Sequence, residues 1–222
     1  MTEKFSFEAT PERGKVSALL LTPPKSKALL ILAHGAGAGM EHANMESIAS
    51  ALAEKQIATF RFNFSYMEQG KGRESAKVSQ DTFLAAVRFV EGLALGIPLY
   101  AGGHSYGGRM CSLLAAQHPD WSIQGLVFFA FPLHAPGKPG TDRAQHLPDI
   151  REPMLFLSGS RDTFMSLDLF HPVLEKLQSK AKLHLLDTAT HGYKVLKRTR
   201  TNPLTVFEEM AEEVESFLNG QP

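Results

Sequence analysis

The segment Gly103-His104-Ser105-Tyr106-Gly107 places a serine between two glycines with the spacing G-x-S-x-G. This spacing is typical of a sharp turn between a strand and a helix, where the serine adopts a strained backbone conformation. The strand and the helix nearly collide there, so the positions two before and two after the serine have no room for side chains. A helix that begins here points backbone N–H groups and its positive dipole end at the serine, which stabilises a developing oxyanion. The segment therefore predicts a nucleophilic Ser105 suited to acyl transfer.

A nucleophilic serine needs a base that takes its proton and a carboxylate that orients the base. The segment SGSRDTF supplies Asp162, and the segment TATHGYK supplies His191. Both follow apolar runs later in the chain, in the order serine, acid, histidine. We therefore predict a triad of Ser105, Asp162 and His191. Asp187, at the end of the run before His191, is the alternative acid.

A second glycine-rich segment, HGAGAG beginning at His34, follows another apolar run and is compatible with a phosphate site or with an oxyanion hole. A dinucleotide site would need glycine where Met40 stands, and an acidic residue at the end of the next strand, which reads RFNFSY. We therefore expect the loop to donate a backbone N–H to a substrate carbonyl oxygen, beside the N–H of Tyr106. Ala36 is the preferred donor and Gly37 the alternative, while His34 is expected to anchor the loop.

Short apolar runs alternate with segments of helical periodicity. The runs Lys4–Ala9 and Lys15–Leu21 flank a turn and predict an antiparallel pair. Most later runs are apolar throughout, which is typical of strands buried on both faces of a parallel sheet. These strands are predicted at Ala28–His34, Ile57–Phe64, Ile97–Gly103, Gly125–Phe131, Pro153–Gly159 and Lys182–Asp187, and helices at Glu41–Lys55, Lys77–Glu91, Tyr106–His118, Leu167–Lys180 and Pro203–Leu218.

This alternation predicts right-handed crossovers and an α/β fold: a doubly wound, mostly parallel sheet of about eight strands with helices on both faces. Ligands bind such sheets beyond the carboxyl ends of the strands. The chain between Phe131 and Pro153 is too short for a helical lid. We therefore expect an open, shallow site at that end of the sheet.

The composition favours a small-molecule partner. The 222 residues hold 23 Lys and Arg against 23 Asp and Glu, so no basic excess indicates nucleic acid. No stretch approaches the roughly 18 apolar residues of a membrane span, and no signal peptide is expected. The single cysteine, Cys111, excludes an internal disulfide and fits a reducing compartment. We expect one cytoplasmic domain over residues 1–222 with no metal and no cofactor; the sequence does not predict its oligomeric state.

Side chains that follow the strand ends are candidates to line a substrate site, although loop packing is the alternative for each. His134, Lys138 and Arg143 could bind an acidic group of a substrate or belong to a solvated loop. The candidate lining residues are Met40, Tyr66, His134 and Phe164, with Met67, Leu133 and Met165 as further candidates.

The motifs HGAGAG, GHSYGG, SGSRD and THGY, in this order over nearly the whole chain, resemble the α/β-hydrolase superfamily. Within it the sequence resembles the small lidless branch near the dienelactone hydrolases, and especially the group with testis-expressed proteins and chromatin-complex subunits; FPLHAPGKPG, starting at Phe131, resembles that group too. Dienelactone hydrolases carry cysteine where this chain has Ser105, so their substrate is not carried over. The resemblance implies an α/β-hydrolase fold without a lid.

The sequence thus predicts a serine hydrolase that cleaves a small ester, thioester or related acyl substrate through an acyl-enzyme. The alternative is a hydrolase fold retained as a protein-interaction subunit with little turnover. A strained serine with glycines on both sides and a complete predicted triad favours the enzyme.

Overall fold

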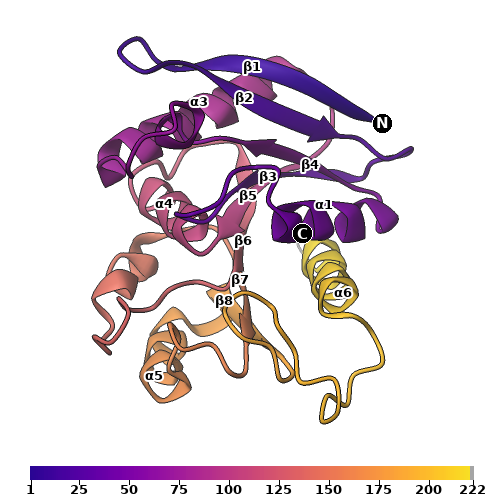
Figure 1. Ribbon diagram of the computed structural model, residues 1–222, viewed down its shortest axis with the longest axis vertical. Coiled ribbons are helices and arrows are strands. Elements are labelled where there is room, and N and C mark those ends of the chain that lie inside the picture. Colours follow the sequence, from indigo (N-terminus) through magenta and orange to yellow (C-terminus); the bar gives the residue numbers. More distant parts are fainter. Residues whose placement is uncertain (221–222) are drawn as a thin grey trace.

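Figure 1 shows the computed structural model, which describes residues 1–220; residues 221–222 of the predicted domain lie outside the described part. An eight-stranded sheet has the order β1-β2-β4-β3-β5-β6-β7-β8. β1 pairs with β2 and β2 with β4 in antiparallel fashion, and every later pair is parallel. The expected mostly parallel sheet is confirmed. Its strands are β1 Thr2–Thr10, β2 Gly14–Leu21, β3 Ala28–Ala33, β4 Ile57–Phe62, β5 Leu99–His104, β6 Ile123–Phe129, β7 Met154–Gly159 and β8 Ala181–Leu186.

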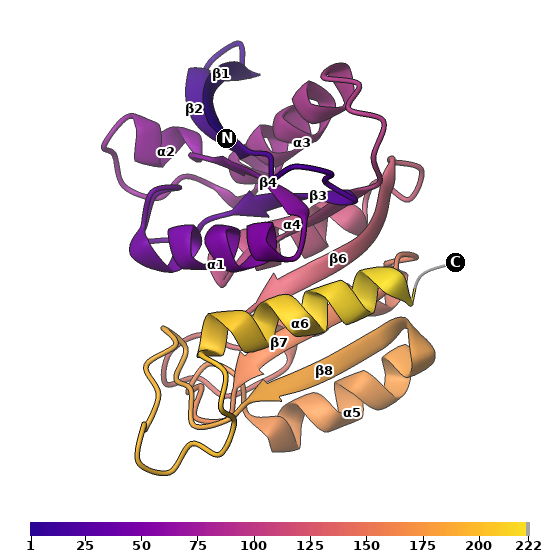
Figure 2. The same ribbon diagram turned by 90° about the vertical axis from the view of Figure 1, so that its right-hand side faces the viewer.

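Helices cover both faces of this sheet (Figures 1 and 2). α1 (Ala43–Glu54) and α6 (Val206–Asn219) lie on one face. α3 (Ala76–Gly92), α4 (Tyr106–Ala115) and α5 (Leu167–Leu177) lie on the other. Shorter helical turns are α2 Ser65–Glu68, η1 Asp142–Ala144, η2 Leu147–Asp149 and η3 Gln178–Lys180.

β3 shows why the central strands are apolar throughout. All of its residues are buried. Successive side chains of a strand point to opposite faces. Leu29 and Ile31 therefore join the core under α3 and α4, whereas Leu30 and Leu32 join the core under α1 and α6. Helices on both faces thus account for the unbroken apolar run.

The start of α6 differs from the expected position, Pro203. The Thr205 hydroxyl accepts a hydrogen bond from the backbone N–H of Glu208, and the Glu208 carboxylate accepts one from the backbone N–H of Thr205. This reciprocal pair satisfies two N–H groups that a helix start leaves without partners. The capping box therefore fixes Val206 as the first residue of α6.

Two other helices end earlier than expected: α4 at Ala115 instead of His118, and α5 at Leu177 instead of Lys180. The residues that follow α5, Gln178–Lys180, form the 3-10 helix η3. They are therefore helical but not part of the α-helix. The four-residue α2 was not predicted because one turn is too short to show a hydrophobic period.

The segment between β6 and β7 carries only the two short turns η1 and η2. The expectation that no helical lid covers the carboxyl end of the sheet is confirmed. Within residues 1–220, no helix combines the length and the apolar character that crossing a membrane requires.

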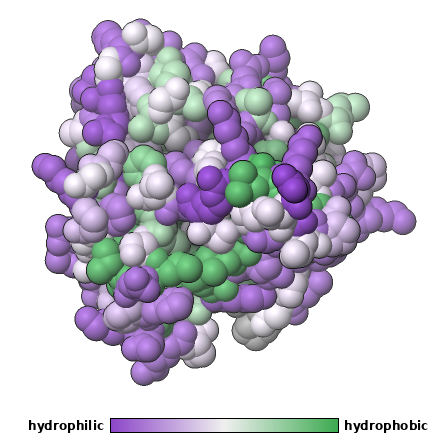
Figure 3. All heavy atoms as spheres, turned by 60° about the horizontal axis from the view of Figure 1, so that its bottom comes forward, coloured by the Kyte–Doolittle hydropathy of each residue, from purple (hydrophilic) through white to green (hydrophobic). Residues whose placement is uncertain are grey.

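The edge of the sheet at β8 is less covered than its centre. Figure 3 shows a hydrophobic band among hydrophilic side chains at the end of the molecule that holds α5 and β8. Leu185 of β8 is exposed, and Leu169 and Val173 of α5 are half-buried. Apolar side chains at this edge are therefore only partly removed from solvent.

Substitution of Gly102 tests how closely the strands pack at the centre of the sheet. A Cβ atom at this position would lie 1.9 Å from the carbonyl oxygen of Val127 in β6. We expect Gly102→Ala to lower the free energy of unfolding by about 3 kcal/mol, because the neighbouring backbone must shift. Gly92→Ala, at the end of α3 with no heavy atom within 4 Å of the added Cβ, is the control and should keep or slightly raise stability. Denaturant unfolding measures both, and a fully stable Gly102→Ala protein would contradict this packing.

Candidate active site

Ser105 lies in the turn between β5 and α4, with φ 50° and ψ −109°. A positive φ is unfavourable for serine and persists only where surrounding contacts enforce it. The Ser105 N–H donates to the Phe129 carbonyl oxygen at 2.9 Å, and the Ser105 carbonyl oxygen accepts from the Arg109 N–H at 3.1 Å. The strained turn is therefore held by β6 on one side and by α4 on the other.

Glycine is required on both sides of Ser105 because β3 passes close to the turn. A Cβ atom on Gly103 would lie 2.6 Å from the Ala33 carbonyl oxygen, and one on Gly107 would lie 2.5 Å from the same atom. Real Cβ atoms do not approach backbone oxygen this closely. The expected lack of room two residues before and two residues after the serine is confirmed.

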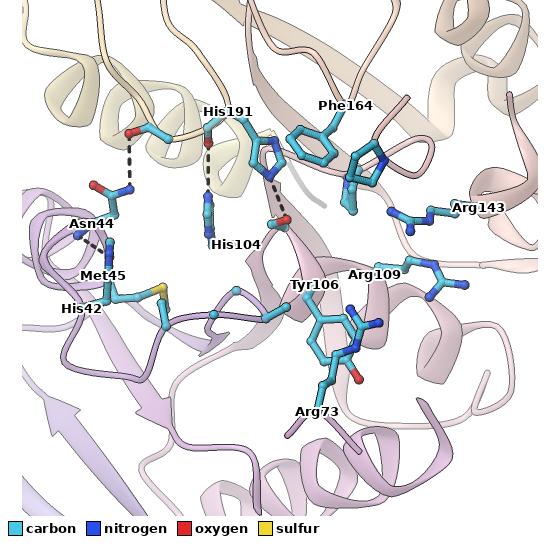
Figure 4. A pocket seen from close by; sticks show the side chains of 18 of the residues that line it. His42, Asn44, Met45, Arg73, His104, Tyr106, Arg109, Arg143, Phe164 and His191 are labelled. Atoms are coloured by element: carbon cyan, nitrogen blue, oxygen red, sulfur yellow. Dashed lines mark hydrogen bonds between the residues drawn. The ribbon is translucent and has the colours of Figure 1, made fainter. Parts of the chain in front are cut away.

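The side chains of Ser105, His191 and Asp162 form a continuous hydrogen-bond chain. His191 points into the site from the loop after β8, and its Nε2 lies 2.8 Å from the Ser105 Oγ (Figure 4). Its Nδ1 lies 2.8 Å from the Asp162 Oδ2. The buried Asp162 carboxylate, in the loop after β7, also accepts from the Phe164 N–H at 2.8 Å. A carboxylate at Nδ1 favours the tautomer whose Nε2 accepts a proton from the serine.

Asp187, the alternative acid, has other partners. Its carboxylate accepts hydrogen bonds from the Thr201 N–H at 2.8 Å and the Thr201 hydroxyl at 3.2 Å. Its carbonyl oxygen accepts from the Arg200 side chain. Asp187 thus holds together the loop that follows β8, while Asp162 occupies the Nδ1 position of His191.

His104, which precedes Ser105 in the sequence, is a neutral side chain beside the hydrogen-bond chain. Burial, together with the nearby His191, lowers the pKa of His104 to about 4. Its Nε2 lies 3.3 Å from the His191 carbonyl oxygen, so it supports the loop that carries His191. A neutral ring here avoids like-charge repulsion when His191 takes up a proton.

The glycine-rich loop after β3 is anchored by His34, as expected. Burial lowers the pKa of His34 to about 4, so the ring is neutral. Its Nε2 accepts from the Phe64 N–H at 3.1 Å, so its Nδ1 carries the proton and donates to the Gly35 carbonyl oxygen at 2.7 Å. The Tyr66 hydroxyl donates to the Ala36 carbonyl oxygen at 3.0 Å. These contacts fix the loop beside the turn at Ser105.

Backbone N–H groups are available next to the Ser105 hydroxyl. Ala36, Gly37 and Tyr106 all line the cavity around it. In the described part of the chain, no acceptor takes the N–H of any of the three. Tyr106 is the first residue of α4, where an N–H has no partner within the helix. The arrangement can supply two donors to an oxyanion, and it leaves both Ala36 and Gly37 possible as the donor from the loop.

A cavity of about 570 Å³ opens at Ser105. One side is formed by the glycine-rich loop with His42 and Asn44, and the other by Arg73, Arg109 and Arg143 (Figure 4). Phe164 lines the cavity as predicted, with its ring centroid 4.3 Å from that of His191.

Met40, Tyr66 and His134, the other predicted lining residues, do not line this cavity. Met40 is buried, and its carbonyl oxygen accepts from Arg61. The buried Tyr66 supports the glycine-rich loop from behind. His134 is buried with its Nδ1 3.0 Å from the Ala135 carbonyl oxygen. Loop packing, the alternative interpretation, describes all three. Met67, Leu133, Met165 and Lys138 do not line the cavity either.

Arg73 and Arg109 line the cavity although neither was predicted from the sequence. Arg109 could have been found, because it stands four residues after Ser105 in a predicted helix and so shares the face of the nucleophile. Arg73 lies in the segment before α3, where no local pattern indicates which way a side chain points.

Cys111 and His184 lie outside the cavity at Ser105. Cys111 is fully buried in α4, and burial raises the pKa of its thiol. His184 lies on the edge strand β8, with its Nε2 2.8 Å from a Glu209 carboxylate oxygen of α6. Among residues 1–220, no group of three or more His, Cys, Asp or Glu side chains could hold a metal ion.

Comparison with known proteins identifies the family. Residues 26–219 match the sequence profile of the alpha/beta hydrolase domain. The chain belongs to the α/β-hydrolase family. Its narrower resemblance to the group with testis-expressed proteins stays a prediction.

Solved structures of hydrolases share the fold of this α/β hydrolase. A dienelactone hydrolase from Anabaena variabilis superimposes with a TM-score of 0.76 at 16% identity, over 99% of this chain and 98% of that one. A lidless serine hydrolase from Xanthomonas campestris gives 0.74 at 18% identity, over 100% and 95%. Est1E from Butyrivibrio proteoclasticus gives 0.73 at 19% identity, over 97% of each. The fold is thus that of the lidless, dienelactone-hydrolase-like enzymes.

Buried neutral His34 predicts that stability depends on pH. Its pKa is about 4 in the folded protein, against an ordinary value of 6.5, so below pH 6.5 protons bind the unfolded chain preferentially. The stabilisation is present above pH 6.5 and is lost as the pH falls toward 4. We expect this histidine to lower the free energy of unfolding by about 2 kcal/mol between pH 7 and pH 5.

Denaturant unfolding at the two pH values checks this expectation. His34→Gln should reduce the difference, whereas His171→Gln, on an exposed position of α5, should leave it unchanged. Equal stability of the wild type at pH 7 and pH 5 would contradict the burial of a neutral His34.

Proposed function

We propose that this α/β hydrolase is a serine hydrolase that cleaves a small ester or thioester through an acyl-enzyme on Ser105. The observation that supports this most strongly is the hydrogen-bond chain from Asp162 through His191 to Ser105, with 2.8 Å at each step. Family membership supports the same reaction class. Est1E, which shares the fold, has been solved with ferulic acid bound, and an esterase domain from Rhodothermus marinus shares the fold as well.

The first half of the proposed reaction forms the acyl-enzyme. The Ser105 Oγ attacks the carbonyl carbon of the substrate while the His191 Nε2 takes the hydroxyl proton, and the Asp162 carboxylate stabilises the resulting imidazolium. The carbonyl oxygen becomes an oxyanion that accepts hydrogen bonds from the N–H groups of Tyr106 and Ala36. His191 then gives its proton to the leaving alcohol or thiol as the tetrahedral intermediate collapses.

The second half releases the acid. Water enters in place of the leaving group, His191 takes one of its protons, and the hydroxide oxygen attacks the acyl carbon. The same N–H groups stabilise the second oxyanion. Collapse breaks the bond to Ser105, whose Oγ recovers a proton from His191. Because these side chains perform every proton transfer, the cycle needs no metal and no cofactor. The single buried cysteine is compatible with action in the cytosol, which we also propose.

Hydrolysis of p-nitrophenyl butyrate tests the proposed triad. We expect kcat/KM to fall to background in Ser105→Ala and by at least about 10³-fold in His191→Ala and Asp162→Asn, since each variant breaks the proton-transfer chain. Ser179→Ala, at an exposed serine of η3, is the matched control and should keep full activity. Full activity of Ser105→Ala would contradict the proposal, and an inactive, folded wild type would favour the protein-interaction alternative.

Ala36→Pro tests the oxyanion donor. The Ala38 N–H donates to the Gly35 carbonyl oxygen at 3.3 Å, so Ala36 is the second residue of a turn, a position that favours proline. The substitution removes the N–H while preserving the turn. We expect kcat to fall by about 10²-fold to 10³-fold with little change in KM.

Gly37→Ala keeps every N–H and adds a Cβ atom with nothing within 4 Å, so this control should retain activity. If folded Ala36→Pro protein keeps its kcat, the donor is the N–H of Gly37 instead.

A further inference from the structure

Three arginine side chains gather on one side of the cavity at Ser105, across from His42 and Asn44 (Figure 4). Arg73 comes from the segment before α3, Arg109 from α4 and Arg143 from η1. We call these three side chains the arginine wall. They come from three separate parts of the chain, so the fold itself brings the positive charges together.

Each arginine is held in place by a different contact. The Arg109 backbone N–H bonds to the Ser105 carbonyl oxygen, which places its side chain one helical turn from the nucleophile. The Arg143 Nη1 donates to the His134 carbonyl oxygen at 3.0 Å, and within residues 1–220 no acceptor takes its other N–H groups. The Arg73 guanidinium carbon lies 5.3 Å from the centre of the Tyr106 ring.

The arginine wall has no carboxylate partner within residues 1–220. None of its members takes part in a salt bridge there, in contrast to Arg151 and Arg200. The Arg109 Nε is buried without any hydrogen-bond acceptor.

Glu74, which among residues 1–220 is the one acidic residue that lines this cavity, has other partners. Its two carboxylate oxygens accept from the Ser65 hydroxyl at 2.6 Å and from the Ser79 hydroxyl at 3.0 Å. It holds together the segment before α3 instead of pairing with the arginines.

This arrangement costs free energy in the absence of a ligand. Burial lowers the pKa of Arg109 and of Arg143, and repulsion within the wall lowers each further. Arg109 and Arg143 are half-buried and Arg73 is exposed. Charged groups that are partly removed from water, as Arg109 and Arg143 are, are normally paired or bind an ion. The chain contains 23 acidic side chains. The lack of a carboxylate beside these guanidinium groups within residues 1–220 is therefore not due to a shortage of acidic residues. An anionic ligand would supply the missing charge and acceptors.

We propose that the arginine wall binds an anionic group, a carboxylate or a phosphate, carried by the acyl substrate of Ser105. Guanidinium groups match both anions in bidentate geometry. This inference rests on the proposed function, because the wall lies in the same cavity as the nucleophile. It narrows the substrate class from small acyl esters to esters that carry an acidic group near the scissile bond.

Matched pairs of esters test the inference. Monomethyl glutarate is compared with methyl valerate for a carboxylate in the acyl part, and butyryl ethylene glycol phosphate with 2-methoxyethyl butyrate for a phosphate in the alcohol part. We expect the ratio of kcat/KM, anionic over neutral, to be at least about tenfold for one pair, as hydrogen bonds to a charged group supply. The pair with the larger ratio identifies the anion. Added salt should lower that ratio.

Substitutions connect the preference to the wall. Arg109→Gln and Arg143→Gln should each lower the ratio at least about tenfold, because each removes a charged donor. Arg88→Gln, at an exposed position of α3 outside this cavity, is the control and should keep the wild-type ratio. Thermal unfolding checks that each variant remains folded; removing like charges offsets part of the loss of the hydrogen bond from Arg143 to the His134 carbonyl oxygen. A ratio near one for both pairs in the wild type, or a ratio unchanged in both Arg109→Gln and Arg143→Gln, would overturn the inference.

Calorimetric titration of Ser105→Ala protein with glutarate and with inorganic phosphate separates the inference from the proposed function. Binding that is lost in the Ser105→Ala, Arg109→Gln double variant supports the arginine wall even if the wild type hydrolyses no ester. Turnover of neutral esters with no anion preference and no anion binding would support the proposed hydrolase function. It would refute the proposal that the arginine wall binds an anion.

Discussion

The site depends on one close approach, that of the Ala33 carbonyl oxygen in β3 to the turn at Ser105. This atom leaves no room for a Cβ at Gly103 or at Gly107. β5 and α4 can therefore approach each other this closely only with glycine at both positions. The turn between them holds Ser105 in a strained backbone conformation. The side chain then stands at the carboxyl end of the sheet, where the loops after β3, β7 and β8 bring the other groups of the site. Because these strands run parallel, all of these groups lie at the carboxyl end of the sheet.

The charges around Ser105 divide the cavity into two parts. On one side lies His104, which is neutral because burial lowers its pKa to about 4; His34, which anchors the glycine-rich loop, is neutral for the same reason. His191 is the histidine that has both a carboxylate at Nδ1 and a hydroxyl at Nε2. On the other side the arginine wall concentrates positive charge. Proton transfer and, as we propose, recognition of an anion are thus assigned to different walls of one cavity.

Much of this could be predicted from the sequence, because the informative residues lie next to strand ends. The G-x-S-x-G spacing and the positions of Asp162 and His191 required only local patterns and the chain order of the strands. The pocket residues were harder: Met40 and Tyr66 also follow strands, yet both are buried. The Tyr66 hydroxyl supports the glycine-rich loop, and the Met40 carbonyl oxygen accepts from Arg61. Whether a loop side chain faces the cavity depends on packing between distant segments. For the same reason the sequence did not predict that Arg73 faces the cavity. Nor did it predict that the three arginines of the arginine wall gather there.

If Ser105 is an activated nucleophile, a fluorophosphonate should trap it covalently. After treatment of the folded protein with a fluorophosphonate, peptide mass spectrometry locates the modified side chain. We predict a single adduct, on Ser105, that no longer forms in His191→Ala because the base is gone. A folded wild-type protein without an adduct, or with its adduct on another serine, would show that Ser105 is not an activated nucleophile.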